Sequence, residues 1–291
     1  MPVRREILFI IVVAVALVVP LPSAAADTLP PIGTPAGPVS LASAPEATDG
    51  AIPLAAARPE WFTPDLGREI AEAAGDPIPA PPDGPLPGTI GIRPGSWMIA
   101  PHGCTMNFIF QKSSSLAIGT AGHCTDHVGR PVTLLTLAPA TENPVLVQVG
   151  TVLVRRDNGI GDDFALVSIR PELRDWVGPT TAVVGGPCGA YVGPGPETVA
   201  HYRHGVGIGT GGTPRAGVAL NWKTSAYAWD GVAVSGDSGI PVRVTQLAAA
   251  GNLTHLVVSS EWLPGIIAGT RIGRMLQIAS GWSLTSSSLC L

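Results

Sequence analysis

Gly236-Asp237-Ser238-Gly239 is the stretch that decides how this 291-residue chain is interpreted. Two other short motifs precede it, Thr120-Ala121-Gly122-His123-Cys124 and Asp163-Phe164-Ala165-Leu166. Together the motifs supply a serine, a histidine and a carboxylate, the groups that convert a weakly nucleophilic hydroxyl into an acyl-transfer catalyst. Gly, Asp and Ser are also ordinary turn residues, so the serine motif by itself would fit a surface turn. The two motifs upstream favour the catalytic interpretation.

In their order and flanking residues, the three motifs resemble those of the chymotrypsin-like (trypsin-fold) serine proteases. The size of the chain is most like that of the compact secreted bacterial members of this family. The resemblance covers residues 90–291; it is strong at the motifs and weak elsewhere. It implies an all-β fold of two antiparallel six-stranded barrels, the first over residues 90–175 and the second over residues 176–291, with the catalytic centre between them.

The apolar pattern points to the same fold class. Short apolar or alternating runs recur between Gly, Pro, Asn and Asp clusters, which is typical of an antiparallel barrel or sandwich. The first set of expected strands covers residues 106–110, 116–118, 132–135, 145–154 and 164–169. The second set covers residues 181–184, 199–202, 217–220, 225–229, 241–244 and 252–258. Apolar residues at helical spacing over 271–279 predict a short C-terminal helix.

The resemblance assigns a role to each catalytic group. Ser238 is the expected nucleophile, and His123 is the general base that takes its proton. Asp163 is expected to hold the imidazole in the correct tautomer and to stabilise the imidazolium. Asp162 is the alternative, because only one of two neighbouring residues on a strand can face His123. The family motif, an Asp followed by an aromatic or aliphatic residue, Ala and Leu, selects Asp163.

The serine motif has further expected roles. The backbone N–H groups of Gly236 and Ser238 are expected to form the oxyanion hole. Asp237 is expected to be a buried carboxylate that holds this turn through a salt bridge. The sequence shows no Ile-Val-Gly-Gly-type start to supply an ammonium partner, and an internal arginine is expected instead. The candidates are Arg174, Arg203 and Arg215.

Two places are expected to bind substrate. Val232 lies six positions before Ser238, where the family has the base of its P1 pocket, and an uncharged residue there predicts an apolar or small P1 side chain. Thr254-His255-Leu256 is expected to be the edge strand that pairs with the substrate backbone.

The first 26 residues are expected to be a secretory signal peptide. Arg4 and Arg5 precede an apolar run over residues 7–19, and small residues up to Ala26 form the cleavage region. The apolar run is shorter than the roughly 20 residues that a membrane-spanning helix needs, and an uncleaved anchor is the less favoured alternative. The mature protein is therefore expected to be secreted and to have no membrane span.

Residues 27–89 are expected to be a Pro/Ala-rich propeptide or spacer. Residues 30–94 contain 15 of the 30 prolines. Proline fixes φ and lacks an N–H, so this composition disfavours sheet and helix and favours an extended, mobile segment. One exception is expected: Thr63 as N-cap and Pro64 as the first helical residue predict a short helix over residues 65–74.

Composition and the number of cysteines indicate which kinds of binding partner the protein is expected to have. The formal charge is −4, or −5 without residues 1–26, and the basic residues form no cluster, so nucleic acid is not an expected partner. Two disulfides are expected in an oxidising compartment, and of three possible pairings Cys104–Cys124 with Cys188–Cys290 is preferred because it anchors the strand before His123. The sequence has no Cys-x-x-Cys pair, so a zinc site is not expected. No other metal and no cofactor is expected either. The expected partner is a polypeptide substrate, and the expected oligomeric state is a monomer.

Only Lys112 and Lys223 are lysines among 17 basic residues, and Ala, Gly, Pro and Val are abundant, which suggests a GC-rich bacterial genome.

Two other functions compete with a secreted serine endopeptidase. A catalytically silent binding protein of the same fold is one, although all three catalytic groups are present. A related acyl hydrolase such as an esterase is the other, but the motif order differs from that of the α/β-hydrolases, and their Gly-x-Ser-x-Gly motif is missing.

Overall fold

The computed structural model describes residues 51–195, 197–203, 213–230, 233–244, 247–257 and 266–290. The expected signal peptide, residues 27–50 and Val232 lie outside these ranges. No helix in the described part of the chain has the length and apolar character needed to cross a bilayer.

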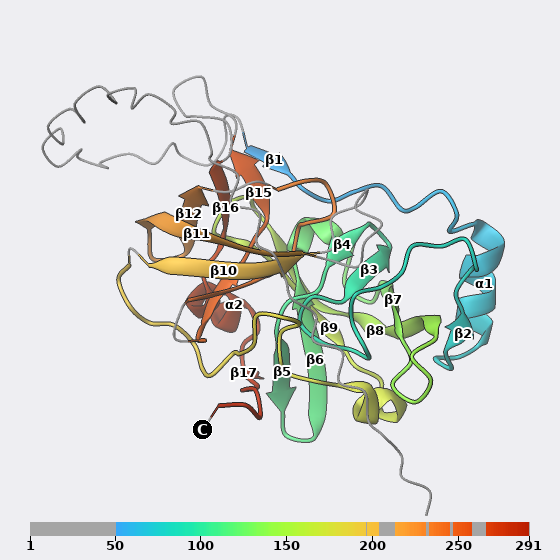
Figure 1. The fold of residues 1–291 in the computed structure, drawn as a ribbon. Helices are drawn as coiled ribbons and strands as arrows, with labels where there is room; N and C mark the ends of the chain where they lie inside the picture. The colour runs from blue at the N-terminus through green and yellow to red at the C-terminus, as the bar shows by residue number, and fades with distance from the viewer. Residues whose placement is uncertain are drawn as a thin grey trace, which may run out of the picture. The chain divides into compact units, whose positions relative to one another are not determined.

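Two curled antiparallel sheets make up the described part of the chain (Figure 1). The first sheet contains β2 (Ile78–Pro79), β3 (Trp97–Ala100), β4 (Cys104–Thr105), β5 (Ile109–Lys112), β6 (Ser115–Thr120), β7 (Pro131–Leu137), β8 (Pro144–Asp157), β9 (Asp163–Ser168) and β17 (Ser283–Leu284). The second contains β1 (Ala51–Pro53), β10 (Thr198–Arg203), β11 (Thr213–Trp222), β12 (Ala226–Asp230), β13 (Pro241–Val244), β14 (Ala249–Asn252), β15 (His255–Val257) and β16 (Ile266–Thr270). The expected all-β class is therefore confirmed.

The number of strands exceeds six in each sheet because short strands add to the sheets from elsewhere in the chain. The first sheet follows the order β17-β5-β6-β9-β8-β7-β3-β4, with β2 paired to β8. The second follows the order β1-β15-β16-β12-β11-β10-β13-β14. One expected strand is wrong: residues 181–184 form a turn, in which Val183 has a φ of 61° before Gly185 and Gly186.

Each sheet encloses its own apolar core. The first core includes Met98, Ile118 and Val147, all inaccessible to solvent. The second is built around Trp229 and Ile267 and other fully buried side chains. Both cores arise from the period-two alternation of the strands, which sends every second side chain inward.

The C-terminal helix is present as α2 (Ile272–Ile278), inside the range that its apolar spacing predicts. Ile272 and Met275 are buried against a cluster that includes Phe110 and Phe164 of the first sheet. A disulfide between Cys188 and Cys290 anchors the chain just beyond this region.

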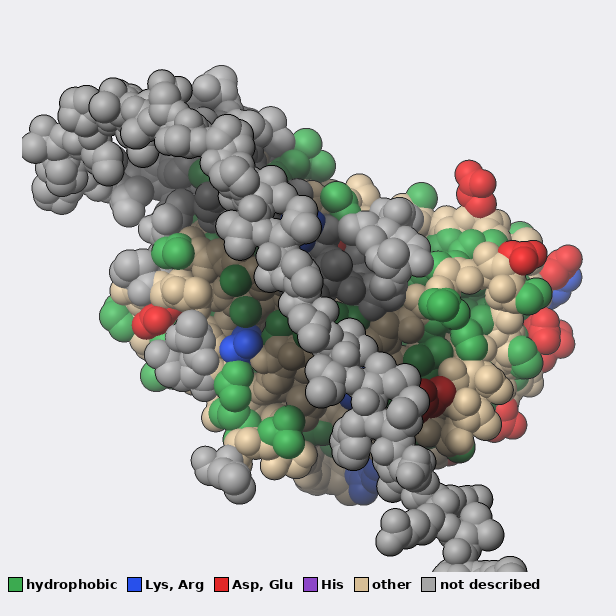
Figure 2. All heavy atoms as spheres, viewed as in Figure 1, with side chains coloured by type: hydrophobic (Ala, Val, Ile, Leu, Met, Phe, Trp, Pro, Cys, Tyr) green, Lys and Arg blue, Asp and Glu red, His purple; other side chains and the backbone are tan. Residues whose placement is uncertain are grey.

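Residues 51–89 are more ordered than their proline content predicts. The expected helix is present as α1 (Pro64–Glu72), where the Thr63 hydroxyl accepts a hydrogen bond from the N–H of Leu66. Its buried residue Ile70 packs with Phe62 and other side chains beside the first sheet. Acidic side chains gather over α1 in the space-filling view (Figure 2), where Asp65, Glu69 and Glu72 are exposed.

The two short strands β1 and β2 were not expected from the composition. Each is an addition to a strand of a larger sheet, β1 to β15 and β2 to β8, and each ends in a proline. Proline is tolerated at such positions because an edge strand leaves part of its backbone without a ladder partner. The low strand propensity of these proline-containing stretches therefore failed to predict β1 and β2, which form because β15 and β8 offer them a partner strand.

Candidate active site

His123 lies in a 3-10 turn, η1 (Gly122–Cys124), that directly follows β6. The neighbouring Cys124 is disulfide-bonded to Cys104, the pairing preferred from the sequence. Gly122 must be a glycine here, because a Cβ would lie 1.6 Å from the carbonyl oxygen of Arg156. The tight turn and the disulfide together fix the backbone that directs the imidazole.

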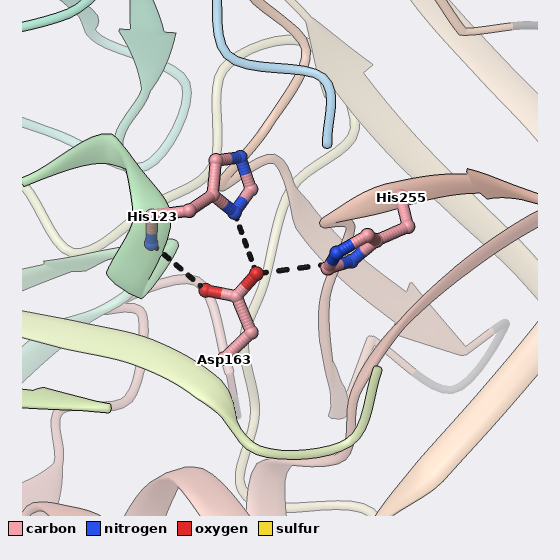
Figure 3. Close-up of side chains that lie close together, drawn as sticks. All are labelled: His123, Asp163 and His255. Carbon is pink, nitrogen blue, oxygen red and sulfur yellow. Dashed lines mark hydrogen bonds and ion pairs between the residues drawn. The ribbon is translucent and has the colours of Figure 1, made fainter. Parts of the chain in front are cut away.

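Asp163 begins β9 and is inaccessible to solvent. Its Oδ2 lies 2.5 Å from His123 Nδ1, and its Oδ1 accepts the N–H groups of Gly122 (2.5 Å) and His123 (3.1 Å). Figure 3 shows the carboxylate between the ring and the backbone of the same histidine. One carboxylate thereby fixes both the turn and the ring orientation.

Asp162 faces away from this centre. Its Oδ1 accepts two hydrogen bonds from Arg274 of α2, at 2.7 and 3.0 Å. Burial acts to raise the pKa of Asp162, but the hydrogen bonds from Asn158 and Arg274 outweigh it and hold the pKa below its ordinary value. Of the two adjacent carboxylates, the structure brings Asp163 to His123, and helix α2 holds the other.

Residues of the second sheet anchor the backbone of Asp163. The Thr270 hydroxyl accepts the N–H of Asp163 and donates to its carbonyl oxygen, both at 3.1 Å. The side-chain amide of Asn252 donates to the same carbonyl at 3.2 Å, and its Oδ1 accepts the N–H of Thr270 at 3.1 Å. These buried bonds connect the two sheets at the carboxylate.

The side chain of Ser238 is brought to His123 from the second half of the chain. Its Oγ lies 2.6 Å from His123 Nε2 and 3.1 Å from the carbonyl oxygen of Thr254, so its one proton can be donated to either. Gly239 follows with a φ of 92°, and a Cβ there would lie 2.0 Å from the carbonyl oxygen of Thr105. Glycine is required at this sharp turn both for its φ and for space.

Gly236 and Asp237 complete the turn. Gly236 has a φ of 97°, and its N–H donates to the carbonyl oxygen of Leu54. Asp237 is buried, and its Oδ2 accepts the N–H of Val234 at 2.9 Å. Arg174, one of its candidate partners, instead donates to the carbonyl oxygen of Ser114, in the turn between β5 and β6.

The side chain of Arg203 lies outside the described part, and Arg215 stays a prediction. Val232, the expected base of the P1 pocket, also lies outside the described residues.

The expected substrate-binding strand is β15, with Thr254 directly before it. β15 pairs with β16 on one side and with β1 on the other, so a strand of the same chain already lies along this edge. The carbonyl oxygen of Thr254 accepts the N–H of Leu54 at 3.2 Å. Leu256 is half-buried and packs beside the second core.

His255 approaches His123 and Asp163 from the second sheet (Figure 3). Its Nδ1 lies 2.7 Å from Thr254 Oγ1 and 3.7 Å from Asp163 Oδ2, and its ring meets that of His123 edge-on at 5.5 Å. Burial lowers the pKa of His255; the nearby Asp163 carboxylate opposes this effect and His123 adds to it. His255 therefore favours the neutral form and does not compete as a second cation for Asp163.

Within the described residues, ligand atoms of His123, Asp163 and His255 lie within 4.8 Å of one another, the composition of a possible metal site. A metal between nitrogen and oxygen ligands about 2.0 Å away in tetrahedral geometry separates those ligand atoms by about 3.3 Å. The Nδ1 of His123 and the Oδ2 of Asp163 are only 2.5 Å apart, which is a direct hydrogen bond. The geometry suits proton transfer better than metal binding.

Three residues that contact the candidate site were not predicted from the sequence: Asn252, Thr270 and Leu54. Asn252 and Thr270 act through backbone groups of a residue about 90 and 107 positions away, and no local motif marks such bonds. Leu54 lies between the prolines at positions 53 and 59, where composition argues against structure. The one local feature that could have indicated a role is an apolar Leu54 followed by three alanines within the Pro/Ala-rich segment.

No protein-family model and no curated protein matches this sequence. Solved structures that match include Thermobifida fusca protease A, at 18% identity and a TM-score of 0.46, over 68% of this chain and 98% of that one. A glutamic-acid-specific serine protease matches at 13% identity and a TM-score of 0.49, over 67% and 100%. An alpha-lytic protease homologue, N4, matches at 17% identity and a TM-score of 0.44, over 68% and 97%. The function of this chain is therefore inferred from its own side chains.

Proposed function

We propose that this protein is a secreted serine endopeptidase that cleaves polypeptides through an acyl-enzyme on Ser238. The observation that carries the proposal is the continuous relay of hydrogen bonds from Asp163 Oδ2 to His123 Nδ1 (2.5 Å) and from His123 Nε2 to Ser238 Oγ (2.6 Å). The three residues are separated by 40 and 75 positions in the sequence, and the relay needs all three at bonding distance.

The relay supports a stepwise acyl transfer. His123 Nε2 takes the proton from Ser238 as Oγ attacks the substrate carbonyl carbon, and the Nδ1–H remains donated to Asp163. The imidazolium then gives its proton to the leaving amine as the C–N bond breaks. Water repeats the sequence at the ester, which releases the acid and restores the serine hydroxyl.

The oxyanion formed in each step needs donors fixed in advance. Gly236 supports this role because its N–H already donates to a carbonyl oxygen beside the serine turn. The N–H of Ser238 is the second proposed donor. Asp237, buried at the centre of the same turn, is the proposed structural carboxylate that keeps these amides in place.

The substrate class follows from the edge of β15, which already pairs with the extended strand β1. A strand edge that pairs with an extended chain recognises polypeptide backbone, which favours peptide over simple ester substrates. We place the main-chain contacts at Thr254, His255 and Leu256, and an apolar or small P1 side chain near Val232. The two disulfides fit export to an oxidising compartment.

A fluorophosphonate probe tests the proposal, because it phosphonylates only a serine activated by a working relay. The purified full chain is expected to carry one adduct, on Ser238, when mapped by mass spectrometry. His123→Ala is expected to abolish labelling without changing the circular dichroism spectrum.

Ser235 offers a matched control, since it is exposed three positions before Ser238 in the same turn region. Ser235→Ala is expected to label at the rate of the unmodified protein, whereas Ser238→Ala is expected not to label. A folded protein that stays unlabelled under every condition would favour the catalytically silent binding protein. Labelling together with hydrolysis of esters but not of peptides would favour the esterase.

A further inference from the structure

The segment that precedes α1 crosses the active site in an extended conformation. β1 adds to the free edge of β15 in antiparallel register, with Ile52 opposite Leu256 and Pro53 opposite His255 (Figure 1). Addition of an extended segment to a sheet edge is one of the recurring ways in which a folded domain binds a peptide backbone. The chain's own residues therefore occupy the place proposed for substrate.

The contacts of Leu54 locate it beside the nucleophile. Its N–H donates to the carbonyl oxygen of Thr254 at 3.2 Å, the same oxygen that lies 3.1 Å from Ser238 Oγ. Its own carbonyl oxygen accepts the N–H of Gly236, one of the two proposed oxyanion donors. Both polar groups of the Leu54 backbone are thus bound by the catalytic turn and its neighbour.

The path on the other side of Leu54 leads to the first sheet. Ala56 and Gly103 exchange two backbone hydrogen bonds, both 2.9 Å long. Gly103 directly precedes Cys104, which is disulfide-bonded to Cys124 next to His123. The bond between Leu54 and Ala55 therefore lies between a contact on the second sheet and a contact on the first, where His123 and Ser238 meet.

The side chains of the segment differ sharply in burial. Leu54 is only 4% exposed and belongs to the core cluster of the second sheet, with Ala233 and Leu256 among its partly buried members. Ile52 is 51% exposed, and Pro53 is exposed as well. The Leu54 side chain is therefore inserted into the protein while Ile52 and Pro53 face solvent. A protease pocket that binds the residue before the cleaved bond would produce this pattern.

Proline at position 53 is compatible with this binding mode. In an antiparallel pair the backbone hydrogen bonds fall on alternate residues. Because Leu54 donates to Thr254, the adjacent Pro53 stands at a position that needs no donor. The missing N–H of proline therefore costs no contact here.

We propose that residues 51–56 are bound as a substrate and that the protein cleaves its own Leu54–Ala55 bond. The proposal rests on the endopeptidase activity proposed above. Ser238 Oγ attacks the Leu54 carbonyl carbon while His123 accepts the serine proton, and the C–N bond to Ala55 breaks as that proton passes to the Ala55 nitrogen. Water then hydrolyses the Leu54 ester, giving a Leu54 carboxylate and a free Ser238 hydroxyl.

The cleavage divides the Pro/Ala-rich segment into two functional parts. The part that ends at Leu54 blocks the site until it is cut, and the part from Ala55 onward remains with the enzyme because α1 and β2 pack on the first sheet. Afterwards the described contacts of the released end are the pairing of β1, the Leu54 side chain and the two Leu54 backbone hydrogen bonds, all non-covalent, so its dissociation opens the site. The same pocket then accepts a leucine-like P1 residue from other polypeptides.

The test compares the full chain with its Ser238→Ala variant by intact mass and N-terminal sequencing. The unmodified chain is expected to acquire Ala55 as a new N-terminus, with a rate that does not change on tenfold dilution, since the reaction is intramolecular. The Ser238→Ala chain is expected to remain uncut at this bond. Cleavage of Ser238→Ala at the same bond, or a new N-terminus elsewhere without cleavage at 54–55, overturns the proposal.

Leu54→Asp and Leu86→Asp form a matched pair. Leu86 is a leucine of the same Pro-rich segment but is 64% exposed. An aspartate at position 54 would bury a carboxylate in an apolar pocket, so we expect self-cleavage to slow by about a hundredfold or more. Leu86→Asp is expected to cut at the normal rate, and equal rates for the two variants would contradict the proposal.

Hydrogen exchange on the intact Ser238→Ala chain keeps the test independent of catalysis. The amides of Leu54 and Ala56 are expected to be protected, because both are donors in the bound segment, and a rapidly exchanging Leu54 amide would argue against binding. The fluorophosphonate result separates the two proposals. Labelling at Ser238 with an uncut 54–55 bond removes self-cleavage and leaves the endopeptidase, whereas no labelling and no cleavage removes both.

Discussion

The two halves of the active site differ in what holds them in place. On the first sheet, His123 and Asp163 are fixed by hydrogen bonds over 40 positions of sequence and by the disulfide beside the histidine. On the second, the N–H of Gly236 and the edge of β15 bind residues 51–54, about 200 positions away in the chain. The hydrogen bonds of His123 and Asp163 are thus part of the fold itself, whereas under the proposed self-cleavage access to the peptide-binding half depends on a segment that proteolysis releases.

The largest change is expected when the two neighbouring carboxylates, Asp162 and Asp163, are each exchanged for an amide. Asp163→Asn is expected to lower kcat for peptide hydrolysis by about 10⁴-fold, because an amide at this position favours the wrong imidazole tautomer. Asp162→Asn loses only a partly exposed ion pair with Arg274, which is worth about 1 kcal/mol or less, and is expected to keep near-normal kcat. Similar losses in both variants would show that the relay does not depend on Asp163 in particular.

The two disulfides are expected to contribute differently to stability and to catalysis. In the chain-entropy model, loops of 20 and 102 residues are worth about 3 and about 5 kcal/mol of unfolding free energy. Denaturant unfolding of the Cys104→Ala/Cys124→Ala and Cys188→Ala/Cys290→Ala variants, in a Ser238→Ala background that prevents self-digestion, measures these losses. Among the active counterparts, kcat is expected to fall only for the pair beside His123. An equal fall in kcat for the distant pair would contradict the local role assigned to the first disulfide.

The Thr270→Val variant tests the hydrogen bonds by which the second sheet holds the backbone of Asp163. Valine has the same shape but leaves the buried N–H and carbonyl of Asp163 without the threonine hydroxyl, so we expect a loss of about 1–3 kcal/mol of stability. We also expect about a tenfold decrease in kcat, because Asp163 is then less well positioned. Thr224→Val, at an exposed threonine, is the control and should change neither quantity. Normal kcat in Thr270→Val would show that Asp163 is positioned by the first sheet alone.

The smallest expected effect concerns His255 and pH. Burial lowers the pKa of His255 in the folded state, so the unfolded chain binds the proton more readily. Stability from this residue is therefore complete above the ordinary histidine pKa of about 6.5 and decreases as the pH falls below it. Unfolding free energies of Ser238→Ala and Ser238→Ala/His255→Gln, measured from pH 8 to pH 5, should show a shallower decline in the second protein. A steeper decline after the substitution would contradict this sign.

Local sequence patterns predicted much of the site. The choice of Asp163 over Asp162, the helix start at Thr63 and the C-terminal helix all followed from immediate neighbours. Strand pairs between distant segments were harder. The expected strand over residues 181–184 is a turn, and β1 was hidden by flanking prolines that argue against sheet.

Local sequence was enough to identify the groups proposed for catalysis and to place most strands and the two α-helices of the described residues, because motifs and periodicity depend on residues close together in the chain. The contacts of Asn252 and Thr270 with Asp163, the burial that lowers the pKa of His255, and the bonds of Leu54 to Thr254 and Gly236 arise only in the folded chain. These contacts join residues that are far apart in sequence, and their energies come from burial and from backbone groups that every residue carries. No local pattern encodes them.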